Sequence, residues 1–320
     1  MKNKILDLLL STDDYISGEY ISNLLGVSRN SIWKHINSLK KEGYLIDAIR
    51  NKGYKLIKSP DTLNIEIVNK LLNTKFIGRN LLHYKEVTST NLVAKDLAQN
   101  NCEDGLVIVS ETQTNGTGRF NRQWQSPLGG LWMSFVLKPN ISPNEGNKIT
   151  LITVAAMVKV LLNLNIQCKI KWPNDIYINN KKVCGILTTM NADMDKINYI
   201  IVGLGININI NEKDFTNDLN TATSLLLEKN TEFNKSEILA KFLNNFEFLY
   251  NNFINNNDLS EVIKICKNNS MLINKEATLI TLRKEEKVTC LGIDDFGELI
   301  IKDSNGNIKK VISGEITFKN

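Results

Sequence analysis

The sequence has little of what builds a disulfide-rich or metal-bound domain. Its 320 residues include only five cysteines and two histidines, and no two cysteines have Cys-x-x-Cys spacing. An odd number of scattered cysteines argues against a disulfide framework and against a structural zinc site. We therefore expect reduced, mostly buried thiols at Cys102, Cys168, Cys184, Cys266 and Cys290.

Long apolar runs and targeting segments are also missing. The longest apolar stretch, Leu151 to Leu162, contains Thr153 and Lys159 and is well short of the roughly 20 residues that span a bilayer. The N-terminal apolar run is too short for a signal peptide and has no small-residue cleavage site. We expect a cytoplasmic protein with no membrane role.

Common nucleotide-binding and nucleophile signatures are absent. No G-x-x-x-x-G-K-[ST] motif occurs, and the dinucleotide fingerprint that begins at Gly116 has Asn121 in place of its third glycine. His35 and His83 fall in different expected domains, so no Ser-His-Asp or Cys-His set is convincing. A P-loop enzyme, a Rossmann enzyme and a covalent hydrolase are therefore excluded.

The remaining composition is that of a folded protein, with 42% hydrophobic and 23% charged residues. The length allows two or three domains. Of the net charge of +5, +4 lies in residues 1–60, which have ten basic and six acidic side chains. A basic terminal segment favours a module that faces nucleic acid, although a solvated charged surface is equally common.

The first 60 residues have the pattern of a helix-turn-helix with a wing. Helices are expected over 3–10 and 17–25, the second stopped by Gly26, and a third begins after the capping residue Ser28. In the third helix an apolar stripe faces the core and the outward side is basic or amide-bearing. Strands over 44–50 and 53–57 form the wing. The alternative is a three-helix interaction domain.

An α-helix fits the major groove of DNA, and cations on a wing neutralise phosphates. Trp33 and His35 are expected to be packing or surface residues and not to read bases. The expected DNA-contacting residues are Ser28, Arg29, Asn30, Lys34, Arg50 and Lys52.

Residues 59–61, Ser-Pro-Asp, are expected to link this module to an α+β domain over 65–255. Its short consecutive strands favour an antiparallel or mixed sheet. The expected strands cover 106–110, 131–137, 169–172, 176–178, 183–188 and 200–210.

The sequence NNFINNND at 251–258 is expected to be a polar break after a helix. Beyond Ser270, short β runs and a Phe296-Gly297 turn predict a small five-stranded barrel over 270–320. The expected β runs cover 277–282, 287–293, 298–302 and 307–313.

The segment Ser110 to Gly130 is long, has four glycines and carries both Arg119 and Arg122. Glycine backbone N–H groups and fixed guanidinium charge suit an anion such as phosphate. The alternative is a merely flexible surface loop.

Two further segments converge on the same chemistry. A hairpin follows the segment Lys171-Trp172-Pro173-Asn174-Asp175 and places Lys171, Asp175 and Lys182 on adjacent strands. Three charges around one aromatic residue favour a binding site, whereas an ordinary cross-strand ion pair is the default for any single contact. In residues 202–210, strict alternation puts glycines and amides on one face of a strand, and such a face can bind a flat polar ring. The alternative, an exposed edge strand, would explain the amides but not the glycines.

The glycine–arginine loop after Glu-x-Gln, Lys-Trp-Pro-Asn-Asp and Gly-x-Gly-Ile-Asn, behind a winged helix and before a β barrel, resembles the bifunctional biotin protein ligases and biotin-operon repressors, the BirA family. The resemblance covers nearly the whole chain. It implies a winged helix-turn-helix, a class II synthetase-like mixed-sheet α+β domain and an SH3-like barrel.

In that family, biotin and ATP with Mg²⁺ give biotinyl-5′-AMP, and the biotinyl group passes to a lysine of a biotin carboxyl-carrier domain. The adenylate then acts as corepressor by favouring a homodimer on operator DNA. The resemblance assigns biotin contacts to Ser89, Thr90, Asn91, Gln113, Thr117, Gly118, Arg119 and Lys182. It assigns ATP or adenylate contacts to Gly116, Arg122, Trp124, Asn174 and Asn207.

The resemblance assigns the reaction itself to Arg119, Lys182, Asp175 and Lys171, with no fixed protein cage for a metal. Asp175 either orients Mg²⁺ or receives the acceptor lysine's proton. Ser89 is also expected to begin a helix as its N-cap. Thr117 and Asn121 replace an arginine and a glycine of the usual family loop. Two rivals are a DNA-binding regulator that only senses a metabolite and a lipoate ligase.

Overall fold

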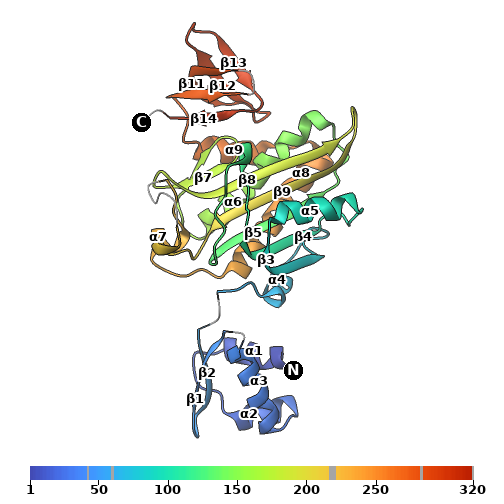
Figure 1. Ribbon diagram of the computed structural model, residues 1–320, viewed down its shortest axis with the longest axis vertical. Helices are drawn as coiled ribbons and strands as arrows, with labels where there is room; N and C mark the ends of the chain where they lie inside the picture. Colours follow the sequence, from blue (N-terminus) through green and yellow to red (C-terminus); the bar gives the residue numbers. More distant parts are fainter. Residues whose placement is uncertain (42, 59–60, 216–220, 282–283, 319–320) are drawn as a thin grey trace. The chain divides into compact units, whose positions relative to one another are not determined.

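The structure is a computed structural model that describes residues 1–41, 43–58, 61–215, 221–281 and 284–318. It separates into two compact units, Met1–Thr62 and Leu63–Asn320, which are described in turn (Figure 1). Ser59 and Pro60 of the expected linker lie outside the described residues, as does Leu282 at the end of one expected strand.

Three helices and a hairpin form the first unit: α1 (Lys2–Leu10), α2 (Gly18–Leu25), α3 (Arg29–Lys41), β1 (Leu45–Ile49) and β2 (Gly53–Lys58). Ser17 caps α2 by accepting from the Tyr20 N–H, and Gly26 ends it with a left-handed φ of 65°. The apolar stripe of α3 is buried as expected, with Ile32, Ile36 and Leu39 at 1% exposure or less. The helix-turn-helix and its wing are confirmed.

A seven-stranded mixed sheet forms the centre of the second unit, in the order β3-β4-β5-β9-β8-β7-β6. Only β3 and β4 are parallel; the other neighbours are antiparallel, which confirms the mixed sheet. The strand β3 has no counterpart in the sequence prediction. The strands are β3 (Leu81–Val87), β4 (Val107–Gln113), β5 (Gly130–Leu137), β6 (Lys169–Lys171), β7 (Asp175–Ile178), β8 (Lys181–Ala192) and β9 (Ile197–Asn207).

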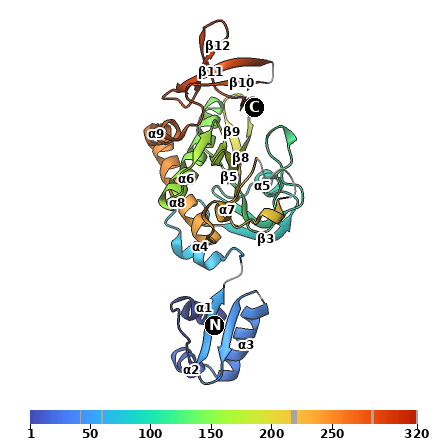
Figure 2. The same ribbon diagram turned by 90° about the vertical axis from the view of Figure 1, so that its left-hand side faces the viewer.

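Helices cover both faces of this sheet (Figure 2). On one face α5 (Thr90–Gln99) packs through Ala94 and Ala98 against β4 and β9. On the other face lie α6 (Gly146–Asn163) and α8 (Lys235–Asn256), with α9 (Ser260–Asn269) beside α6. The short helices α4 (Ile65–Leu71) and α7 (Leu225–Lys229) complete the unit. No helix among the described residues has the length and apolarity to cross a membrane.

The expected polar break at 251–258 is wrong, because α8 continues to Asn256. Leu249 and Tyr250 precede Phe253 by about one helical turn on the core face, and all three are at most 5% exposed. Their burial outweighs the low helix propensity of the surrounding asparagines. Asn257 then ends the helix with a left-handed φ of 52°.

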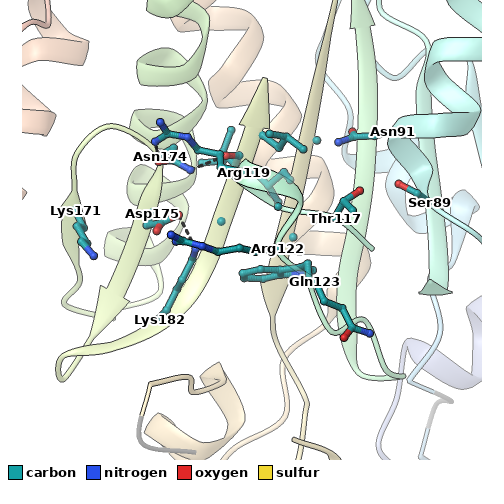
Figure 3. A pocket seen from close by; sticks show the side chains of 18 of the residues that line it. Ser89, Asn91, Thr117, Arg119, Arg122, Gln123, Lys171, Asn174, Asp175 and Lys182 are labelled. Carbon is teal, nitrogen blue, oxygen red and sulfur yellow. Dashed lines mark hydrogen bonds and ion pairs between the residues drawn. The ribbon is translucent and has the colours of Figure 1, made fainter. Parts of the chain in front are cut away.

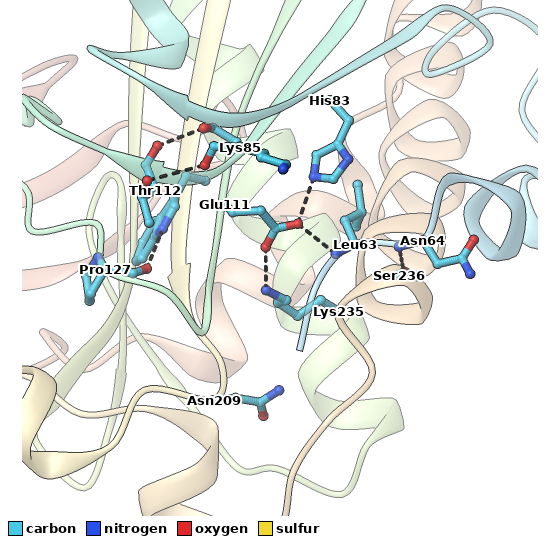
Figure 4. A network of polar contacts seen from close by, with 12 residues as sticks. Leu63, Asn64, His83, Lys85, Glu111, Thr112, Pro127, Asn209, Lys235 and Ser236 are labelled. Atoms are coloured by element: carbon cyan, nitrogen blue, oxygen red, sulfur yellow. Dashed lines mark hydrogen bonds and ion pairs between the residues drawn. The ribbon is translucent and has the colours of Figure 1, made fainter. Parts of the chain in front are cut away.

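A buried ionic network holds the start of the second unit to its sheet (Figure 4). The Glu111 carboxylate on β4 accepts from Lys235 Nζ at 2.9 Å, the Leu63 N–H at 2.7 Å and, at 2.7 Å, bonds His83 Nε2. Burial alone would raise the pKa of Glu111, but His83, Lys235 and the Leu63 N–H lower it to about 2. The network therefore needs an ionised carboxylate.

The C-terminal residues form a five-stranded antiparallel sheet in the order β13-β12-β11-β10-β14. No ladder joins β13 to β14 within the described part of the chain, so the pairing is that of an open sheet. Trp172 joins the central domain to this sheet by donating from Nε1 to the Gly297 carbonyl at 3.0 Å. The strands are β10 (Lys275–Ile280), β11 (Glu285–Ile293), β12 (Leu299–Asp303), β13 (Ile308–Val311) and β14 (Glu315–Thr317).

Candidate active site

A cavity of about 370 Å³ lies over β8 and β9 of the central sheet, on the side that α5 covers. Its other walls are the start of α5, β14 and a segment that we call the glycine–arginine loop, residues 114–129. Most of the residues that the sequence assigned to biotin, ATP and catalysis line this cavity, and Gly116 and Asn207 do not. Figure 3 shows their side chains converging from these separate elements.

One end of the cavity is lined by uncharged hydrogen-bonding groups. The Gln113 side-chain oxygen accepts from the Thr90 N–H at 2.8 Å and its hydroxyl at 3.1 Å, while Gln113 Nε2 donates to Ser126 Oγ at 2.8 Å. Ser89 precedes α5 as expected, but its side chain makes no capping bond. Gln113 therefore takes over the role expected of Ser89, and Ser89 is left to face the cavity.

Glycines of β9 and β8 form the floor because larger residues would collide with side chains above them. A Cβ on Gly203 would lie 2.3 Å from Asn91 Oδ1, and one on Gly205 would lie 2.5 Å from Trp124 Nε1. Both distances are below 3.0 Å, a separation that Cβ atoms in close-packed interiors essentially never show. The alternation expected for 202–210 is confirmed, except that β9 ends at Asn207.

The glycine–arginine loop folds back on itself as a narrow hairpin. The Gly118 N–H donates to the Arg122 carbonyl at 2.8 Å, and the Trp124 N–H donates to the Gly116 carbonyl at 2.8 Å. At its tip Phe120 and Asn121 have φ values of 55° and 56°. Asparagine tolerates this left-handed conformation better than other side chains, which explains how Asn121 replaces the family's glycine.

Arg119 reaches from the loop tip to two other parts of the unit. Its guanidinium donates to Asn174 Oδ1 at 3.0 Å and to the Gly314 carbonyl at 3.0 Å. Burial lowers the pKa of Arg119, and the carboxylates of Asp175 and Glu315 oppose that shift. A partly desolvated, oriented cation of this kind binds a phosphate or carboxylate strongly.

Lys182 and Asp175, which we expected on adjacent strands, form an ion pair with Nζ 2.7 Å from Oδ1. The same ammonium lies 5.0 Å from the centre of the Trp124 ring. Lys171 is opposite Asp175 in the strand register, yet its ammonium lies 5.8 Å from the Tyr177 ring, and burial lowers its pKa. Lys171 lines the cavity without joining the ion pair.

Asn207 lies beside a second cavity of about 330 Å³, which shares Trp124, Lys182 and Arg122 with the first. Its side-chain amide donates to the Thr223 carbonyl at 2.9 Å. The Trp124 indole lines both cavities, and its Nε1 is buried without a hydrogen-bond partner.

Sequence reasoning missed Glu315 and Ser134. Glu315 projects from β14 and binds Arg122, and Ser134 on β5 contacts Thr90 Oγ1 and Asn91 Oδ1 at 2.7 Å each. Neither residue belongs to a motif. Ser134 lies in the expected strand 131–137, but that does not identify its neighbours across the fold. Glu315 lies on β14, outside every expected β run, so no sequence signal pointed to it.

The arrangement can hold a two-part ligand. Amide and hydroxyl groups lie at one end, and Arg119, Arg122 and Lys182 supply positive charge at the other. Such a site can bring two anionic groups together and stabilise charge that develops between them.

Comparison with known proteins agrees with this geometry. Residues 83–207 match the biotin/lipoate A/B protein ligase family, 2–55 match an HTH domain, and 272–319 match the biotin protein ligase C-terminal domain. The bifunctional ligase/repressor BirA of Bacillus subtilis is 37% identical over 95% of this chain and 94% of its own length. BirA of Escherichia coli is 28% identical, and the match covers 97% of this chain and 95% of that protein.

A solved structure of similar fold is the biotin protein ligase of Aquifex aeolicus in complex with biotin and ATP. It has a TM-score of 0.63 and 28% identity, and the match covers 75% of this chain and 98% of that one. The expected resemblance is therefore confirmed, and this chain belongs to the BirA family of bifunctional ligase/repressors.

Proposed function

We propose that this chain is an ATP-dependent biotin–protein ligase that also represses transcription, with biotinyl-5′-AMP as product of the first step and as corepressor. The observation that carries the ligase activity is the single cavity that joins Gln113 and Thr90 to Arg119 and the Lys182–Asp175 pair. Membership of the BirA family supports both activities.

In the first step a biotin carboxylate oxygen attacks the α-phosphorus of ATP, and pyrophosphate leaves. Both reactants are anions, so the site must offset their repulsion while holding them in line. Arg119 and Lys182 supply positive charge. Gln113, Ser89 and Asn91 bind the uncharged ureido ring of biotin. Trp124 stacks near the nucleotide. Gly116, Thr117 and Gly118 close the loop over the acyl-phosphate, and Asn174 orients Arg119.

In the second step the amine of a carrier lysine attacks the acyl carbon, AMP leaves, and the amine loses a proton. Both Asp175 and Glu315 line the cavity, and Glu315 is bound to Arg122. Asp175 can therefore receive this proton once Lys182 has turned to the phosphate. Lys171, whose pKa burial lowers, supplies further charge at the rim.

Mg²⁺ binds one or two protein carboxylates and otherwise substrate phosphates and water. Asp175 fits that requirement, because it is the cavity carboxylate beside Lys182 and the loop. Mg²⁺ would supply charge to the triphosphate when bound.

Biotin-dependent ATP–pyrophosphate exchange tests the ligase proposal. A ligase exchanges labelled pyrophosphate into ATP only with biotin present, a lipoate ligase does so with lipoate, and a mere sensor does neither. Lys182→Met should lower the exchange rate at least about 100-fold because the site loses a charge and leaves Asp175 unpaired.

For repression, we propose that the adenylate favours a homodimer that pairs two winged helices on a palindromic operator. Arg29, Asn30, Lys34, Arg50 and Lys52 are exposed, and Ser28 lies at the start of α3. Because a ligand that promotes dimerisation must promote operator binding, gel shifts should show tighter binding with biotin and ATP. Equal affinity in both conditions would refute the coupling.

Two finer features of the fold are also proposals. Five consecutive antiparallel strands support an SH3-like arrangement for the C-terminal sheet, and a largely antiparallel sheet flanked by helices supports a class II synthetase-like central domain. We also propose that the three domains cover residues 1–60, 65–255 and 270–320, and that the protein is cytoplasmic.

A further inference from the structure

Trp33 is the one tryptophan of the chain that is well exposed. Its exposed fraction is 58%, whereas Trp132 and Trp172 are at most 2% exposed and Trp124 is half-buried in the cavity. Leaving an indole in water forfeits one of the largest apolar burials available to any side chain. The position of Trp33 therefore calls for a partner outside the described fold.

Trp33 lies in the middle of α3, next to the outward face of that helix. Arg29 and Asn30 precede it by four and three residues, so they are its neighbours on the helix surface, and Lys34 follows it directly. All three are exposed. The indole is thus an apolar element within a surface of cations and amides.

The charge around Trp33 selects the kind of partner. Arg50 and Lys52 at the exposed wing turn add to the basic side chains of α3, in a segment with ten basic and six acidic residues. Such a surface fits a polyanion, and a helix of this width enters the major groove of duplex DNA. The apolar group that the major groove offers is the 5-methyl of thymine.

From the sequence we expected Trp33 not to read bases, but its exposure among cations and amides leads us to the opposite inference. We propose that Trp33 is a specificity-determining residue of the repressor, which contacts a thymine methyl group in the major groove. This inference rests on the proposed repressor function and names the base feature that the exposed indole reads. Asn30 and Lys34 lie beside Trp33 for polar contacts. Arg29 is ion-paired with Glu19 at 2.8 Å, but both side chains are 69% exposed, so Arg29 also remains available.

The test uses the full chain with biotin and ATP, and the duplex that the wild-type protein selects from a random-sequence pool. Trp33→Ala should bind that duplex about 10- to 100-fold more weakly, the size of one or two base contacts. The slope of affinity against salt should stay unchanged because no phosphate contact is lost. Lys34→Ala should instead reduce that slope by about 1.

Replacing each thymine of the duplex by deoxyuridine removes only the methyl group. At one position this replacement should weaken wild-type binding several-fold and leave Trp33→Ala unaffected. Leu24→Ala is the matched control, since Leu24 is also apolar and 53% exposed but lies on α2; it should behave as wild type. The unfolding transition of the first unit, followed by circular dichroism, checks that each variant is folded, because biotin-dependent exchange reports only on the second unit.

The proposal fails if Trp33→Ala selects the same sequence with the same affinity, or if no thymine methyl distinguishes it from wild type. It also fails if Trp33→Ala weakens the dimer in sedimentation experiments without changing the contacts to thymine, because the indole would then bind protein. A wild-type protein that selects no sequence at all would overturn the repressor function itself.

Discussion

The Arg122 guanidinium lies 2.5 Å from the Glu315 carboxylate, so the glycine–arginine loop is tied to a strand 193 residues further along the chain. The hydrogen bond to Glu315 raises the pKa of Arg122. Beside it, Arg119 bonds the Gly314 carbonyl. The C-terminal sheet therefore forms part of the candidate active site and holds its loop.

A double-mutant cycle on Arg122 and Glu315 measures that tie. Each of Arg122→Ala and Glu315→Ala should speed release of biotinyl-5′-AMP about threefold, because the Arg122 side chain is 64% exposed and such pairs stabilise weakly. The double variant should release it no faster than either single variant. Fully additive effects would show that the two residues act separately.

Replacing Arg119 should have a larger effect. Arg119→Ala removes an oriented cation with two hydrogen bonds, and we expect adenylate release to be about 10- to 100-fold faster. Arg119→Lys keeps the charge but not the forked geometry and should be intermediate. Release is measured by chasing the preformed complex with unlabelled biotin. An unchanged rate in Arg119→Ala would contradict the assignment.

Gly205 should not tolerate a methyl group, because the added Cβ would lie 2.5 Å from Trp124 Nε1. Gly205→Ala should displace the indole, shift the tryptophan fluorescence and weaken adenylate binding about tenfold. Gly292 on β11 is the matched control, since a Cβ there meets nothing within 4 Å. Gly292→Ala should bind the adenylate normally, and equal losses in both variants would argue for general destabilisation.

The Glu111 network predicts a pH-dependent stability. At pH 7, Glu111→Gln should lower the free energy of unfolding by about 3 kcal/mol because the buried Lys235 ammonium loses its ion pair with Glu111. The folded pKa of about 2 lies below the ordinary 4.5, so wild-type stability from this carboxylate is present above pH 4.5 and is lost as pH falls toward 2.

The difference between wild type and Glu111→Gln should accordingly shrink as urea unfolding is repeated from pH 7 to pH 3. Glu237→Gln, which removes an exposed partner of Lys241 on the same helix α8, should cost less than about 0.5 kcal/mol at every pH. A constant difference across that range would mean that folding does not lower the pKa of Glu111.

Local sequence determined most of the elements and the positions of the motifs. Gly26 ended α2, alternation placed Gly203 and Gly205 on one face of β9, and the Lys171–Asp175 motif led into a hairpin that pairs Lys182 with Asp175. These features depend on neighbours within a few residues, or on adjacent strands. Periodicity and turn chemistry therefore suffice to predict them.

Tertiary structure decided what comes together from distant parts of the chain. The asparagines after Tyr250 favour a break locally, but burial of Phe253 keeps α8 helical. Glu315, and the Glu111–Lys235 pair, became visible only when the sheet and helices were assembled, because the free energy of such contacts depends on burial and proximity that no short segment encodes.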